Sequence, residues 1–131
     1  MDDMVEEIQK YQITNSKTIK ERKQKILQSI LEPDEYKRYQ SLLLEYRYVD
    51  EVDELRLGSY LRFIKMNVDS VDTLSLGKGG FLADIKMKQG IVLLLKNNNR
   101  FFQLKMDECI LFQKNTKQEE LLIQILDHIK G

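Results

Sequence analysis

The sequence predicts an α+β protein in which a small, five-stranded antiparallel β-barrel lies between helical segments. Two observations support this prediction. Residues 58–113 contain short segments that alternate apolar and polar residues and end in glycine or asparagine turns, as hairpin-connected strands do. The segments on both sides repeat apolar residues at helical spacing. With 131 residues, 42% of them hydrophobic and 32% charged, the chain has the composition of one globular domain.

The elements divide the chain into three parts that we expect to form one compact unit. These are an N-terminal helical arm over residues 1–54, the barrel over residues 55–115, and an amphipathic helix over residues 116–131 that packs on the barrel. The arm begins with a short helix that carries Val5 and Ile8 on one face. This predicted helix is short and weak.

Two longer helices follow in the arm. The first begins near Ser16 or Thr18, because Thr18 and Glu21 have the spacing of a capping box. The second begins at Pro33, where the missing N–H of proline costs no hydrogen bond, and runs to about Tyr48. The short connection between them favours an antiparallel helical hairpin.

The strands are placed by their alternation and by the turns between them. We expect strands over residues 58–66, 81–88, 91–95, 100–106 and 109–113. Gln89-Gly90 reads as a two-residue turn, and Asn97-Asn98-Asn99 as a three-residue loop. Gly77-Lys-Gly-Gly80 lacks the spacing of a phosphate-binding loop and precedes a strand instead of a helix. A turn that requires positive φ is therefore the better account of these glycines.

These turn lengths set a register, and the register assigns each side chain to a face. The inner face then holds Phe81, Ala83, Ile85, Met87, Val92, Leu94, Phe102, Leu104 and Met106. The outer face holds Leu82, Lys86, Lys88, Ile91, Leu93, Leu95, Phe101 and Lys105. A monomer rarely exposes such a large apolar patch, so Leu82, Ile91, Leu93, Leu95 and Phe101 are expected to be covered. The cover is the chain's own helices, a second copy, or a protein partner.

The C-terminal segment supplies one such cover. Thr116 and Glu119 match a capping box, which marks the start of a helix. The apolar stripe behind it consists of Leu121, Leu122, Ile125, Leu126 and Ile129. Burying these side chains would stabilise the contact by about 1.5–3 kcal/mol each.

Charge is distributed unevenly along a chain whose formal net charge is zero. Residues 1–54 contain 13 acidic and 9 basic residues, whereas residues 55–115 contain 5 acidic and 10 basic ones. The acidic arm lies against the basic barrel, both are merely solvated, or the barrel meets an anionic partner. For a single-stranded nucleic acid the candidate contacts are Tyr60, Arg62, Lys65, Lys86, Lys88, Lys96, Arg100, Phe101 and Lys105.

The residues that usually carry catalysis or bind metals are scarce. The only cysteine, Cys109, lies in an apolar strand and reads as a buried inert thiol, and the only histidine, His128, reads as a surface residue. We therefore expect no catalytic residue, metal, cofactor or small-molecule substrate. Asp69, Asp72 and Asp84 near the glycine loop leave an enzyme open as a third hypothesis.

The sequence also bears on location. No apolar run approaches the ~20 residues of a membrane span. The N-terminus is acidic, without the basic and then apolar layout of a signal peptide. One cysteine excludes an internal disulfide. The expected location is therefore a reducing, intracellular one, either cytoplasmic or in a virus particle, without membrane contact.

Two resemblances extend this interpretation. By strand count and loop lengths the barrel resembles the SH3-like and Sm-like small barrels, a fold that hosts many functions. The segments Gly58–Ile64, Leu76–Leu82, Ile91–Lys96 and Ile110–Lys114 also resemble a pattern in small uncharacterised proteins of large DNA viruses. That resemblance implies a component of a virus particle or virus factory and carries no catalytic residues.

Two functions follow from the sequence. The first is a non-enzymatic structural or protein-interaction module that associates with itself or with a protein partner. The alternative is a small-barrel protein that binds single-stranded nucleic acid.

Overall fold

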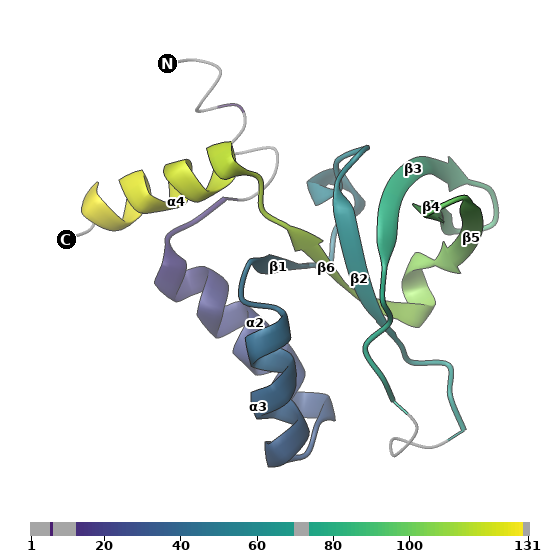
Figure 1. The fold of residues 1–131 in the computed structure, drawn as a ribbon, viewed down its shortest axis with the longest axis horizontal. Helices are drawn as coiled ribbons and strands as arrows, with labels where there is room; N and C mark the ends of the chain where they lie inside the picture. Colours follow the sequence, from purple (N-terminus) through teal and green to yellow (C-terminus); the bar gives the residue numbers. More distant parts are fainter. Residues whose placement is uncertain (1–5, 7–12, 70–73, 130–131) are drawn as a thin grey trace. The chain divides into compact units, whose positions relative to one another are not determined.

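The computed structural model describes residues 6, 13–69 and 74–129 of the chain. The chain divides into two compact units, whose elements are labelled in Figure 1. The helical unit comprises residues 1–48 with 115–131, and the sheet unit comprises residues 49–114. The short helix expected around Val5 and Ile8 lies outside the described residues.

The described part of the helical unit contains the two helices of the expected hairpin and the C-terminal helix. These are α2 (Ser16–Ile30), α3 (Pro33–Leu42) and α4 (Lys117–Ile129). The N-cap of α2 is Asn15, whose side chain accepts a hydrogen bond from the Thr18 amide at 2.9 Å. The helix therefore begins at Ser16, one of the two expected starts, although Asn15 caps it instead of the capping box expected at Thr18 and Glu21. The predicted start of α3 at Pro33 is confirmed.

The predicted capping box of α4 is confirmed. The Glu119 amide donates to Thr116 Oγ1 at 3.0 Å, and the Thr116 amide donates to Glu119 Oε1 at 2.9 Å. Behind this cap, buried apolar side chains form a small core of the helical unit. Its members are Ile13, Leu122 and Ile123, with Ile19 and Leu126 packed against them.

Helix α3 ends earlier than the sequence predicts. It stops at Leu42 instead of about Tyr48, and the chain forms strand β1 (Tyr46–Val49). Aromatic and β-branched residues favour a strand, and alternate side chains of β1, Arg47 and Val49, are buried. Past Leu42 the tyrosines continue the helical spacing, so the sequence pattern predicted further helix here instead of a strand.

The sheet unit contains five strands at the predicted places. They are β2 (Tyr60–Lys65), β3 (Gly80–Met87), β4 (Ile91–Asn97), β5 (Arg100–Lys105) and β6 (Cys109–Lys114). The sheet is antiparallel and six-stranded, in the order β1-β6-β2-β3-β4-β5. This order has two ends, so the described sheet is not closed. The prediction of a five-stranded SH3-like barrel is therefore wrong, although the α+β class is confirmed.

The register differs from the predicted one at three places. Met87 pairs with Ile91, so the first turn holds three residues instead of two. Asn97 pairs with Arg100, so the second turn holds two residues instead of three. A bulge at Ala83 shifts the pairing once more within β3. Each one-residue shift moves the following side chains to the opposite face.

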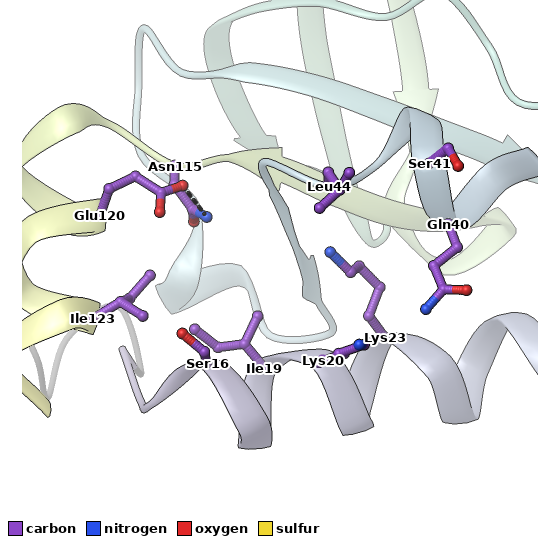
Figure 2. Close-up of a pocket in the computed structure, with 10 residues that line it drawn as sticks. All are labelled: Ser16, Ile19, Lys20, Lys23, Gln40, Ser41, Leu44, Asn115, Glu120 and Ile123. Atoms are coloured by element: carbon purple, nitrogen blue, oxygen red, sulfur yellow. Dashed lines mark hydrogen bonds between the residues drawn. The ribbon is translucent and has the colours of Figure 1, made fainter. Parts of the chain in front are cut away.

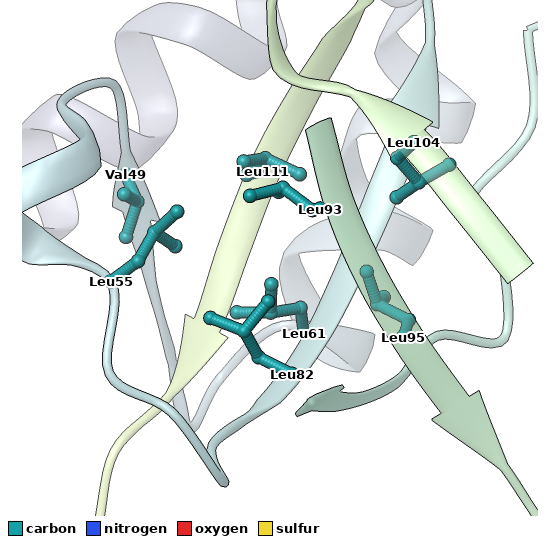
Figure 3. Close-up of a cluster of buried hydrophobic side chains, with 8 residues drawn as sticks. All are labelled: Val49, Leu55, Leu61, Leu82, Leu93, Leu95, Leu104 and Leu111. Atoms are coloured by element: carbon teal, nitrogen blue, oxygen red, sulfur yellow. The ribbon is translucent and has the colours of Figure 1, made fainter. Parts of the chain in front are cut away.

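These shifts place the expected outer leucines inside. Leu82, Leu93 and Leu95 are almost fully buried. They belong to a core cluster, shown in Figure 3, of Val49, Leu55, Leu61, Leu82, Leu93, Leu95, Leu104 and Leu111. Ile91, also expected outside, is partly buried and packs against this cluster. The expected covered outer face is thus not formed, because four of its five apolar residues serve the core.

The prediction of positive φ in the glycine loop is confirmed at Gly79, which has φ +92°. A Cβ atom there would lie 2.1 Å from the carbonyl oxygen of Leu61. Glycine is therefore required both by the conformation and by the close approach of the β2 backbone. This approach brings the loop directly alongside β2.

Candidate functional site

One row of side chains crosses the face of the sheet opposite the core, which we call the outer face. Tyr60 of β2 pairs with Phe81 of β3, Phe81 pairs with Lys96 of β4, and Lys96 pairs with Phe101 of β5. Directly opposed residues in antiparallel strands point to the same side of a sheet. Their chain neighbours Leu61, Leu82 and Leu95 lie in the core. We call Tyr60, Phe81, Lys96 and Phe101 the outer row.

The side chains of the outer row make two contacts with one another and remain accessible. The rings of Tyr60 and Phe81 meet edge to face, with centroids 5.0 Å apart at 83°. Lys96 Nζ lies 5.6 Å from the centroid of the Phe101 ring. Phe81 and Phe101 nevertheless expose 54% and 58% of their surface. The row is therefore an exposed aromatic surface that includes one cationic side chain.

Hydrogen bonds to the glycine loop hold this end of the sheet. The Tyr60 hydroxyl donates to the carbonyl oxygen of Lys78 at 2.8 Å. Asn97 Nδ2 donates to the carbonyl oxygen of Gly79 at 2.8 Å. Arg62 Nε donates to the carbonyl oxygen of Gly77 at 3.0 Å. The loop before β3 is thus fastened to β2 and β4, which limits the motion of the row.

Basic side chains surround the outer row. Arg62 follows Tyr60 by two residues on β2 and therefore shares its face. Further along the sheet, Lys86 pairs with Val92, and Val92 pairs with Lys105. Both lysines are exposed. Asp84 is the one acidic residue among the paired strand positions of this face, and these positions together carry a formal charge of +3.

The structure brings together some of the nucleic-acid contacts predicted from the sequence and separates others. The outer face gathers Tyr60, Arg62, Lys86, Lys96, Phe101 and Lys105. Lys65 lies instead on the face of Leu61, at the end of β2, opposite Cys109. Lys88 lies in the turn after β3, and Arg100 starts β5 opposite Asn97. These three residues are not part of the site.

Sequence reasoning missed Phe81, which the predicted register assigned to the barrel interior. Its exposure follows from the bulge at Ala83, which lets Leu82 point into the core while Asp84 and Phe81 both point outward. The sequence holds one signal for this arrangement. Glycines precede Phe81, and an irregular strand start next to glycines is a common place for a bulge.

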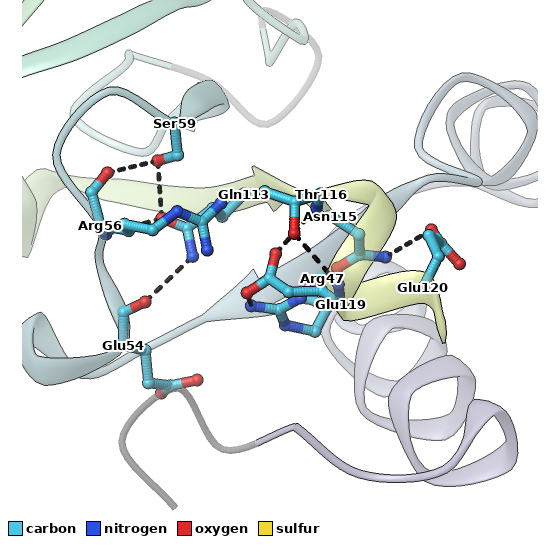
Figure 4. Close-up of polar contacts among 9 residues, drawn as sticks. All are labelled: Arg47, Glu54, Arg56, Ser59, Gln113, Asn115, Thr116, Glu119 and Glu120. Carbon is cyan, nitrogen blue, oxygen red and sulfur yellow. Dashed lines mark hydrogen bonds and ion pairs between the residues drawn. The ribbon is translucent and has the colours of Figure 1, made fainter. Parts of the chain in front are cut away.

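Two buried polar networks, shown in Figure 4, are structural in character because their members bond one another. In the sheet unit, Gln113 accepts from the Arg56 amide at 2.9 Å and the Ser59 hydroxyl at 2.7 Å, and donates to the Glu54 carbonyl at 2.9 Å. In the helical unit, Arg47 donates to Asn115 and to Glu119, the latter at 3.1 Å.

Among the described residues, the groups considered for catalysis lie on separate elements, with Cys109 on β6, Asp84 on β3 and His128 on α4. Cys109 is half-buried, and burial raises the pKa of its thiol to about 11, so the thiol is protonated at neutral pH. His128 is exposed in the last turn of α4. Within residues 6, 13–69 and 74–129, no three His, Cys, Asp or Glu side chains are grouped as metal ligands. Asp72 lies outside these residues.

No helix in the described part of the chain is both long and apolar enough to cross a membrane. Comparisons with protein-family models, with curated proteins and with solved structures found no match. The class of protein therefore follows from the geometry alone: a small α+β protein with an exposed aromatic and basic sheet face.

Proposed function

We propose that the sheet unit is a non-enzymatic module that binds single-stranded nucleic acid on its outer face. The observation that carries the proposal is the outer row, in which three aromatic rings and one ammonium group lie side by side across four strands. Phe81 and Phe101 are each more than half exposed, and they lie in one row instead of being scattered singly over the surface. Aromatic side chains of this kind offer platforms on which bases stack without sequence preference.

The dimensions of the row suit a short stretch of a single strand. Neighbouring strands lie about 4.8 Å apart, so the three steps from Tyr60 to Phe101 span about 14 Å. Exposed aromatics on comparable four-stranded sheets stack about two or three bases. In a duplex these base faces are covered by neighbouring base pairs. The row therefore favours single strands over duplexes.

The basic residues lie where the backbone of such a strand would run. Lys86 and Lys105 flank Val92 on the neighbouring strands. Val92 lies four residues before Lys96 on β4, so this lysine pair is about 13 Å from Lys96 along the strand. A phosphate between the stacked bases would meet Lys96, and phosphates beyond them would meet Arg62 on one side of the row and the Lys86–Lys105 pair on the other. Contacts of this type supply affinity without sequence specificity.

Fluorescence anisotropy with labelled single-stranded and duplex oligonucleotides tests the proposal. The chain should bind the single strand more tightly. Phe101→Ala removes one stacking platform, worth about 1–3 kcal/mol per base, so affinity should fall by about 5-fold to 150-fold. Met87→Ala is the matched control, because Met87 is an exposed apolar side chain of the same sheet outside the outer row. No binding at low salt, or equal losses in both variants, would refute the proposal.

Protein docking through α4 is a second candidate function. Leu121, Ile125 and Ile129 are exposed apolar residues at a spacing of four, which places them on one side of the helix. The viral resemblance of Gly58–Lys114 implies a setting, the virus particle, in which such docking would serve assembly. Light scattering of the wild type and of Leu121→Lys tests it. A monomer with no partner in a pull-down from its source would end this candidate.

A further inference from the structure

A pocket of about 390 Å³ opens in the helical unit and belongs to neither function above. Figure 2 shows its walls. They consist of Ser16, Ile19, Lys20, Lys23, Gln40, Ser41, Leu44, Asn115, Glu120 and Ile123. Its size falls within the range of about 300–1,000 Å³ typical of small-molecule sites. Three of the ten lining residues are aliphatic and the other seven are polar or charged, so the pocket is more polar than most small-molecule sites and suits a polar or charged ligand.

A buried ammonium group lies in the wall of this pocket. Lys23 is 6% exposed, and its Nζ donates to the carbonyl oxygens of Leu43 at 2.7 Å and Tyr46 at 2.9 Å. An ammonium group has three N–H donors, so one remains after these two bonds. Burial lowers the pKa of Lys23 to about 8, while Glu120 opposes this shift, so the group is mostly charged at neutral pH.

The described residues that line the pocket include two cations, Lys20 and Lys23, and one anion, Glu120. Lys20 lies one helical turn before Lys23 on α2, and its repulsion contributes to the lowered pKa of Lys23. Glu120 is the one carboxylate among the described residues of the wall, and its Oε1 already accepts a hydrogen bond from Asn115 at 3.0 Å. Two ammonium groups thus share the wall with one carboxylate whose hydrogen-bonding capacity is partly used. An anion is the ligand that would complete this arrangement.

We propose that this pocket binds a small organic anion, with its carboxylate or phosphate at Lys20 and Lys23 and a compact apolar body against Ile19, Leu44 and Ile123. Two features support the assignment. The ammonium of Lys23 is held in place by backbone carbonyls, so its position requires no reorganisation on binding. The three aliphatic side chains line the same pocket and can contact the remainder of the ligand.

Titration with phenyl phosphate and with benzoate, followed by amide chemical shifts, tests the proposal. Shifts should concentrate in residues 16–23, 40–44 and 115–123. Lys20→Gln should weaken binding by about tenfold, the loss expected from one charged hydrogen bond. Lys20 is exposed, so this variant should fold. Lys25→Gln, which changes the same charge at an exposed position of α2 outside the pocket, should bind as the wild type does.

A second variant should change the affinity for the anion in the opposite direction. Glu120→Gln keeps an oxygen for Asn115 but removes the competing negative charge, so binding should tighten severalfold. The proposal is overturned if neither probe shifts these amides at millimolar concentration, or if Lys20→Gln and Lys25→Gln behave alike. Shifts confined to β3, β4 and β5 would also overturn it, since they would show that the ring of the probe prefers the outer row.

Discussion

The salt dependence of single-strand binding should reflect the number of cations on the outer face. Four basic side chains lie there: Arg62, Lys86, Lys96 and Lys105. Each phosphate contact to a single strand contributes about 0.7 to the negative slope of log K against log salt concentration. If all four residues contact phosphates, the slope should be about −2.8. A shallower slope would mean that fewer of them do.

Replacing two of these cations should change the slope by a defined amount. Lys86 and Lys105 are exposed and flank Val92, so Lys86→Gln combined with Lys105→Gln should leave the fold intact. With two contacts removed, the slope should fall to about −1.4. Anisotropy titrations of a short oligothymidylate at several salt concentrations measure it. The affinity at low salt should also fall, because two phosphate contacts are lost, but the free energy contributed by base stacking should be unchanged.

The control removes the same charge elsewhere. Lys25→Gln combined with Lys37→Gln neutralises two exposed lysines of α2 and α3. This control should keep the wild-type slope, since neither residue belongs to the sheet unit. An equal change of slope in the two double variants would show that only net charge matters. That result would contradict the assignment of phosphate contacts to the outer face.

Three further predictions concern stability. Leu93→Ala should lower the unfolding free energy by about 2–5 kcal/mol in urea titrations, because Leu93 is fully buried; a change near zero would contradict the observed register. Arg47→Met should lower the unfolding free energy by about 3–5 kcal/mol because it removes the cation paired with the buried carboxylate of Glu119; a loss near zero would argue against the pair. The pKa of Lys23 is lowered from 10.5 to about 8 by folding, so the unfolded chain binds more protons between these values. Stability relative to Lys23→Met should therefore rise across this pH window, and a constant difference would count against the shift.

Much of the fold could be predicted because the signals are local. Strand positions follow from alternation and from Gln89-Gly90 and the asparagine run, both of which include a positive φ residue. The capping box at Thr116 and the proline at Pro33 mark helix starts by their own chemistry. Such signals involve residues only a few positions apart in the chain, so they can be recognised in the sequence without knowing the fold.

Register could not be predicted, because it depends on single residues in turns and bulges. Lys88 joins the first turn, Asn97 stays in its strand, and Ala83 bulges. Polar residues at strand ends suit either a turn or a strand, so the pattern alone does not decide. The energy of burying Leu93 and Leu95 together decides it, and that energy depends on contacts between distant strands.

The candidate site, like the fold, could be predicted from the sequence only in part. Charge and composition indicated the basic and aromatic residues of 55–115 as candidates. Which of them share a face depends on register, so the sequence could not join Phe81 to Phe101 through Lys96. The pocket beside Lys23 was missed because it is built from segments more than 70 residues apart in the chain.

Photo-crosslinking with an oligonucleotide that carries 5-iodouracil tests most directly whether bases stack on the outer row. Irradiation joins this base to aromatic side chains in contact with it, and mass spectrometry identifies the peptides. Crosslinks should map to Tyr60, Phe81 and Phe101 and should disappear from the β5 peptide in Phe101→Ala. Crosslinks found only in α2, α3 or α4, or none in a chain that binds the oligonucleotide, would contradict the proposed interface.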